Sequence, residues 1–103
     1  MASGRLGAND LAATTNTTVY TVPAGKLATF NVSLTNRNSV PVNVRLAFAT
    51  TGTPGLAEWL FYDYSIAANG TIERTGLVAD ATKLLVAYAG TTGVSVVAYG
   101  LED

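Results

Sequence analysis

Apolar and polar residues alternate along most of this chain, which is the period-two pattern of β-strands buried on one face. Between residues 28 and 36, Phe30, Val32 and Leu34 fall on one face, and threonine, asparagine and serine fall on the other. Residues 40–48 repeat the pattern with valine, leucine and phenylalanine on the apolar face. We expect these two segments to pair as antiparallel strands that cover one side of a core.

Turn-forming residues separate the alternating runs and set their number. Breakers gather at residues 23–25, 36–39, 50–56, 69–70, 80–82 and 90–93. The expected strands include residues 17–22, 28–36, 40–48, 59–66, 83–89 and 94–101. Seven or eight short strands with no helical segment predict an all-β fold, an antiparallel β-sandwich of the jelly-roll kind.

The chain contains one Asn-Gly pair, which is a strong hairpin signal. A two-residue loop there would set Ile66 opposite Glu73. A three-residue loop with its glycine in the left-handed region instead sets Ile66 opposite Ile72, and Tyr64 opposite Arg74. We expect the three-residue loop, because it pairs apolar with apolar and stacks a cation on an aromatic ring.

The first sixteen residues differ from the rest of the chain. Leu6 and Leu11 are their only sizeable apolar side chains, so residues 1–16 cannot bury enough surface to fold alone. We therefore expect an extended N-terminal arm over residues 1–16, disordered or held against a neighbour, and a single β-sandwich domain over residues 17–103.

The last two strands predict self-association. Residues 83–89 and 94–101 read as a closing hairpin, in which Leu84 and Val86 point to one face and Leu85 and Ala87 to the other. A strand that is apolar on both faces is buried on both. A sandwich of this length has nothing of its own to cover the second face, so we expect another subunit to cover it.

Composition narrows the classes of function. Of 103 residues, 13% are charged, about half the usual ~25%, and the net charge is −1. The six basic residues are spread singly, whereas nucleic-acid binding needs clustered cations. No apolar run approaches the ~18–20 residues of a membrane helix. We expect neither a nucleic-acid nor a membrane partner, and we expect a low-charge surface that faces another protein.

The chain has no histidine and no cysteine, which removes the usual tools of catalysis and metal binding. We expect no catalytic residue, no metal and no cofactor. The least favoured alternative is a glycan-cleaving enzyme that uses Asp63 and Glu73, which the expected register places on one face. Lone carboxylates on a sheet face are far more often solvated.

Aromatic residues concentrate on the strand over residues 59–66. Strict alternation puts Trp59 and Phe61 on one face and Tyr62 and Tyr64 on the other. We expect one pair in the core and the other at an interface. The alternative is a carbohydrate-binding module in which Trp59 and either tyrosine stack on sugar rings.

Several segments together resemble small structural proteins of tailed bacteriophage virions, with cyanobacterial phages the nearest association. The segments that carry the resemblance are Leu6–Leu11, Thr18–Lys26, Asn31–Leu46, Ile72–Val78 and Val94–Asp103. The resemblance implies a non-enzymatic virion protein, a capsid decoration or cement protein that contacts other copies and the major capsid protein. It also implies a homo-oligomer, with a trimer by analogy. A tail, neck or fibre component is the alternative position.

We expect the subunit contacts to use apolar side chains from three parts of the chain. The candidate interface residues are Leu6, Leu11, Trp59, Phe61, Val97 and Tyr99. In this account the protein resides in the virion and stabilises the particle by bridging neighbouring subunits.

Overall fold

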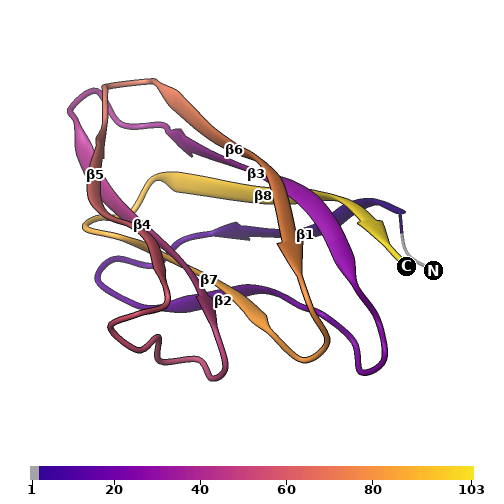
Figure 1. Cartoon of the computed structure of the whole chain (residues 1–103). Helices are drawn as coiled ribbons and strands as arrows, with labels where there is room; N and C mark the ends of the chain where they lie inside the picture. The colour runs from indigo at the N-terminus through magenta and orange to yellow at the C-terminus, as the bar shows by residue number, and fades with distance from the viewer. Residues whose placement is uncertain (1–2) are drawn as a thin grey trace.

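A computed structural model describes residues 3–103 and shows two four-stranded antiparallel sheets packed face to face (Figure 1). The strands are β1 (Ser3–Asp10), β2 (Thr17–Thr21), β3 (Ala28–Asn36), β4 (Val42–Ala49), β5 (Trp59–Ile66), β6 (Thr71–Ala79), β7 (Leu84–Ala89) and β8 (Val94–Glu102). Their order is β1-β8-β3-β6 in one sheet and β2-β7-β4-β5 in the other. We call them the first sheet and the second sheet.

The strand order is that of a jelly roll, in which most consecutive strands lie in opposite sheets. The chain crosses between the sheets at every connection except the one from β4 to β5, which pair as neighbours. The two central ladders, β3 with β8 and β4 with β7, join segments far apart in the sequence. The expected all-β sandwich is therefore confirmed.

Three strand pairings expected from the sequence are wrong. β3 does not pair with β4, β5 does not pair with β6, and β7 does not pair with β8, because the members of each couple belong to different sheets. Alternation shows which side chains face the core, and that pattern is the same for two hairpin strands as for two strands facing each other across a core. The connections here are arches between the sheets, not hairpin turns.

The arch at one end is held by Asn36, whose side chain is fully buried. Its amide donates to the carbonyls of Val40, Ile66 and Ala67, at 2.8, 3.2 and 3.2 Å. The left-handed residue of the neighbouring connection is Asn69, with φ of 57°, and not the glycine that follows it. The expected three-residue hairpin loop is therefore absent. The chain instead crosses from β5 in one sheet to β6 in the other, and the hydrogen bonds of Asn36 hold this connection in place.

The N-terminal arm expected over residues 1–16 is not confirmed. Residues 3–10 form β1, which pairs with β8 at the edge of the first sheet, and residues 1 and 2 lie outside the described part of the chain. Leu6 packs partly buried against the core, and Leu11 is 1% exposed within it. The segment finds its apolar partners inside its own domain, because β8 offers an open edge to pair with.

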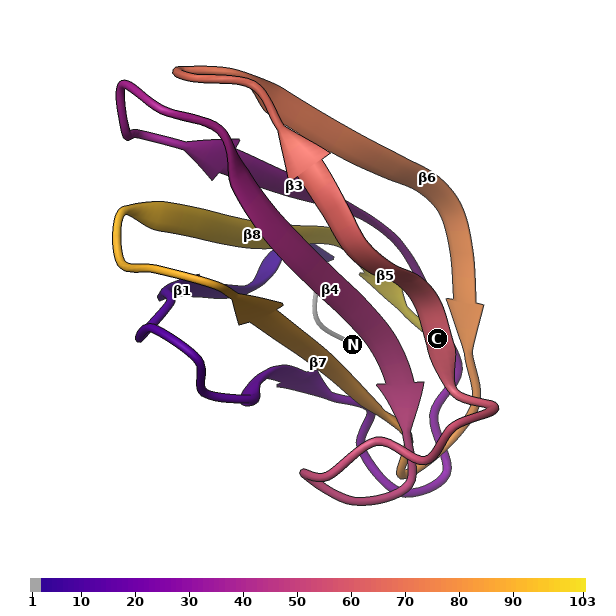
Figure 2. The same cartoon turned by 90° about the vertical axis from the view of Figure 1, so that its left-hand side faces the viewer.

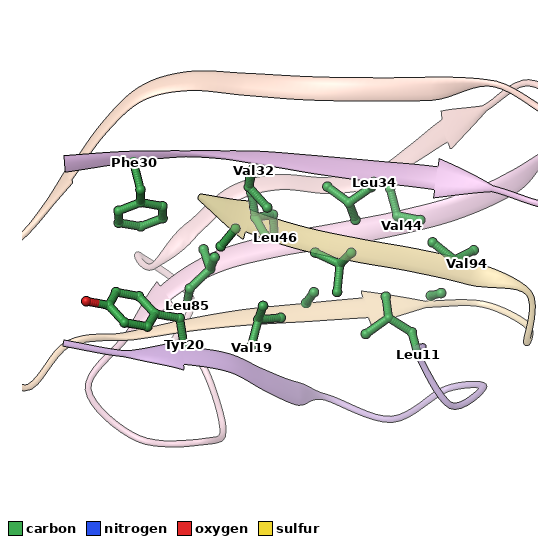
Figure 3. Packing of buried hydrophobic residues seen from close by; sticks show 14 of the residues in the cluster. Leu11, Val19, Tyr20, Phe30, Val32, Leu34, Val44, Leu46, Leu85 and Val94 are labelled. Carbon is green, nitrogen blue, oxygen red and sulfur yellow. The ribbon is translucent and has the colours of Figure 1, made fainter. Parts of the chain in front are cut away.

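The core fills the space between the two sheets (Figure 3). Phe30 of β3 lies edge to face with Tyr20 of β2, with ring centroids 5.8 Å apart, and makes the same contact with Phe48 of β4. Valine, leucine and alanine fill the rest. Among residues 4–103, every buried side-chain nitrogen and oxygen has a hydrogen-bond partner.

Every edge strand carries a β-bulge, whereas the two central ladders are continuous. The extra residue always lies on the edge strand: once in β1, once in β2, once in β6 and twice in β5. A bulge twists a strand and interrupts its row of free backbone groups. These edges are therefore poor templates for pairing with a strand of another chain.

Candidate functional site

Two bulges in β5 determine which face of the sheet each aromatic side chain of this strand points to. Because Leu46 pairs with Phe61 and Ala47 with Trp59, the strand gains residues relative to β4 and its alternation breaks. Trp59 and Tyr62 consequently contact each other, with ring centroids 5.1 Å apart. The expectation that strict alternation would put them on opposite faces is wrong.

Arg45 of β4 lies between two of the tyrosines on the outer face of the second sheet. Its guanidinium carbon is 4.0 Å from the ring centroid of Tyr62 and 4.2 Å from that of Tyr88. Its Nε donates to Asp63 at 2.7 Å, and this hydrogen bond raises the pKa of Arg45. We call Trp59, Tyr62, Arg45 and Tyr88 the aromatic stack. Aromatic residues and arginine are the types that dominate protein contact surfaces.

On one side of the sandwich β5 and β6, the edges of opposite sheets, run past one another (Figure 2). Side chains of these two strands line a groove there. It has a volume of about 420 Å³ and is lined by Phe61, Tyr64, Ile72, Glu73 and Arg74. The rings of Phe61 and Tyr64 are 5.8 Å apart, and the guanidinium of Arg74 is 5.4 Å from the Phe61 ring. We call this the β5–β6 groove.

The opposite side of the sandwich is closed. There β1 and β2 approach so closely that a Cβ atom added at Gly7 would stand 2.2 Å from the carbonyl oxygen of Val19. Glycine is required at this point, since any side chain would meet backbone. The sandwich thus has one sealed side and one side that carries a groove.

The outer face of the first sheet carries an exposed apolar corner. Thr29 pairs with Val78 of β6 on one side and with Leu101 of β8 on the other. Leu27, two residues before Thr29, exchanges two backbone hydrogen bonds with Asp103. Leu27, Val78 and Leu101 are 44%, 56% and 55% exposed. We call these three side chains the apolar corner; they are distant in sequence, so no local pattern revealed them.

The six candidate interface residues fall into three groups. Leu6, Leu11 and Phe61 pack in or against the chain's own core. Trp59 belongs to the aromatic stack. On β8, Val97 and Tyr99 are partly buried and lie across from Ser33 and Asn31 of β3, whose side chains point away from the core.

The expectation that both faces of the last two strands need a partner is corrected by their separation into different sheets. Val86 points away from the core cluster, yet it is fully buried between its neighbours Thr18 and Ala47. A single chain therefore buries Val86 without a second subunit. On β8, by contrast, Leu101 remains exposed.

The two carboxylates considered for glycan cleavage are not brought together. Asp63 is paired with Arg45 in the second sheet. Glu73 accepts a hydrogen bond from the hydroxyl of Tyr99 at 2.7 Å in the first sheet, and this bond raises the pKa of Tyr99. Each acid has its own partner, so the expected register that placed them on one face is wrong.

Within residues 3–103, no three acidic side chains gather closely enough to hold a metal ion. The same part of the chain contains no helix of the length and apolarity needed to cross a membrane. Comparison with protein-family models, with curated proteins and with solved structures found no match to this chain.

Proposed function

We propose that this chain is a non-enzymatic structural protein of a phage virion, a decoration or cement protein that holds neighbouring subunits together. The observation that carries the proposal is the apolar corner on a surface with few charges. Leu27, Val78 and Leu101 lie around Thr29 on one face, and exposed apolar side chains gathered on one face of a small domain mark a contact surface. The resemblance of the sequence to small virion proteins is the reason for placing this contact surface in a phage particle.

The charged residues around the apolar corner favour a second copy of this chain as a partner that binds there. The exposed Lys26 adjoins Leu27, and the exposed Asp80 and Asp103 lie at the ends of the neighbouring strands. A symmetric contact needs one surface that complements itself. An apolar centre with both signs of charge at its rim meets that need, and the contact would expel water from all three side chains.

The bulged edges support contact through faces and not through strand pairing. All four edge strands are interrupted, so a neighbour gains little by adding a strand to either sheet. The outer faces are continuous, because the central ladders run without a break. The jelly roll is also a fold on which viral capsid domains are built, although fold alone does not assign a function.

Sedimentation velocity on two matched variants tests the contact surface. Leu101→Asp places a charge in the apolar corner and is expected to shift the protein toward monomer. Leu56→Asp is the control, because Leu56 is 99% exposed on the loop that joins β4 to β5 in the second sheet, whereas the corner belongs to the first sheet. If the two variants have the same sedimentation coefficient, the apolar corner is not the contact surface.

Cryo-electron microscopy of purified virions tests the setting. The proposal expects density for this sandwich in many copies on the particle, with the apolar corner covered by a neighbouring subunit. Virions in which the protein is absent would refute the structural role, and a position in the neck, tail or fibre would replace decoration of the capsid.

A further inference from the structure

The β5–β6 groove offers aromatic surface and hydrogen-bonding groups that the fold does not use. Tyr64 is 49% exposed, and its ring stands beside that of Phe61. Among the residues that the structure describes, Arg74 makes no ion pair and no side-chain hydrogen bond, so its donors remain available at the rim. The carboxylate of Glu73 is fixed by Tyr99 through one oxygen and keeps the other free.

The aromatic stack on the outer face lacks this freedom. Arg45 already covers the rings of Tyr62 and Tyr88, and Asp63 holds the guanidinium in place. A ligand ring would have to displace a cation that is bonded on three sides. The sugar-stacking shelf considered from the sequence, which combined Trp59 with Tyr62 or Tyr64, is therefore not formed at this stack.

The chemistry of the groove selects its ligand. Arg74 can only donate hydrogen bonds and ionised Glu73 can only accept them. A hydroxyl group does both, so a ligand rich in hydroxyls satisfies the two side chains at once. An anion would meet the carboxylate of Glu73, and a wholly apolar ligand would leave both charged groups without partners.

We propose that the β5–β6 groove binds a neutral carbohydrate. A sugar ring lies against the exposed ring of Tyr64, and its hydroxyls bond to Glu73 and Arg74. The volume of about 420 Å³ is in the range of small-ligand pockets, roughly 300–1,000 Å³. An extended peptide is disfavoured, because it would bind by pairing with an edge strand and both β5 and β6 are bulged.

The test uses the whole chain and a glycan array that carries neutral oligosaccharides of glucose, galactose, mannose and N-acetylglucosamine. Sialylated and uronate-containing glycans serve as the anionic arm. Neutral glycans that bind are then titrated into ¹⁵N-labelled protein. We expect the amide signals of residues 71–74 to shift, and we expect Tyr64→Ala and Arg74→Ala each to weaken binding at least tenfold.

Tyr62→Ala is the matched control. Tyr62 and Tyr64 are both about half exposed on β5, but Tyr62 belongs to the aromatic stack. Its loss should leave glycan binding unchanged. The proposal is overturned if no neutral glycan binds at millimolar concentration, if only anionic glycans bind, if shifts map outside the groove, or if Tyr62→Ala weakens binding as much as Tyr64→Ala. A peptide that shifts residues 71–74 while no glycan does would assign the groove to a protein partner.

This inference is independent of assembly. If the protein binds a neutral glycan but is a monomer, the carbohydrate site is supported and self-association is refuted. If the protein self-associates but binds no glycan, self-association is supported and the carbohydrate site is refuted.

Discussion

The hydroxyl of Tyr20 donates a hydrogen bond to the carboxylate of Glu102, which joins the two sheets across the interior although 82 residues separate the pair in sequence. Both residues are 8% exposed. Tyr20 also packs its ring against Phe30, so the same side chain contributes to the apolar core and binds the buried carboxylate of Glu102. The bond fixes β8 at its last residues against β2.

This pair predicts a loss of stability at alkaline pH. Burial, and then the hydrogen bond and charge of Glu102, raise the pKa of Tyr20 above its ordinary value. The folded chain keeps this proton where the unfolded chain releases it. The contribution is therefore complete below about pH 10, the ordinary tyrosine pKa, and declines as pH rises further.

Urea unfolding between about pH 8 and pH 11 measures the effect. Tyr20→Phe should lower the free energy of unfolding at pH 8 by about 1.5–3 kcal/mol, because Glu102 loses its donor, and should make the alkaline decline shallower. A decline as steep in the variant as in the parent protein would show that Tyr20 does not titrate in this way.

The buried amide of Asn36 predicts a large cost of substitution. Asn36→Ala removes a donor from three carbonyl oxygens at the arch, of which that of Ala67 keeps a second donor, the backbone N–H of Gly70, and each buried group left unsatisfied costs about 1–3 kcal/mol. We expect a total loss of at least about 2 kcal/mol in chemical denaturation. Asn43→Ala is the control, since Asn43 is exposed on β4. Its effect should stay within about 0.5 kcal/mol. A similar cost for both would remove Asn36 from its role as the fixing point of the arch.

We expect that no side chain can be accommodated at position 100, where β8 passes close to the backbone of β3. A Cβ atom there would stand 2.2 Å from the carbonyl oxygen of Thr29 and 2.5 Å from the Cα of Phe30, both backbone atoms. Gly100→Ala should therefore destabilise the fold by more than about 3 kcal/mol, or prevent folding. Gly52→Ala, where the nearest atom is 3.9 Å away, should be nearly neutral in a thermal melt. A stable Gly100→Ala protein would show that the two strands are spaced differently.

The stack around Arg45 predicts that lysine cannot replace arginine there. Lysine keeps the charge but loses the planar group that covers two rings and bonds Asp63, so Arg45→Lys should cost about 1 kcal/mol. The single tryptophan, Trp59, reports unfolding by its fluorescence. In the control Arg37→Lys, the ion pair with Asp10 is exposed, and the change should stay within about 0.5 kcal/mol. Equal costs would mean that the stack contributes no more than a surface ion pair.

Strand positions were predictable from the sequence, because alternation is a local property. The expected segments 28–36 and 59–66 coincide with β3 and β5, and the segment 94–101 differs from β8 by one residue. Strand pairing was not predictable in the same way. Whether a turn joins neighbours in one sheet or crosses the core depends on contacts such as those of Asn36, which come from distant parts of the chain.

β1 and the arrangement of the aromatic strand were missed for two different reasons. Residues 3–10 contain little alternation, and β1 forms because β8 provides an edge to pair with. In β5, bulges shift the side-chain period, so Trp59 joins Tyr62 and Phe61 joins Tyr64. Asp63, with φ of 53°, marks one of these irregular points, and a single sequence gives little warning of it.

The β5–β6 groove combines residues that the sequence had singled out with others that it had not. Tyr64 and Arg74 were expected to stack within a hairpin, but the guanidinium lies over Phe61 and the two strands belong to different sheets. The expected pairing was wrong, yet both side chains line the β5–β6 groove.

Light scattering across a dilution series tests the central claim, that this sandwich works by associating through its outer faces. One chain has a mass of 10.6 kDa. We expect a measured mass that is a whole multiple of this value at micromolar concentration and that falls toward the mass of one chain on dilution. A mass of one chain at every concentration would contradict it.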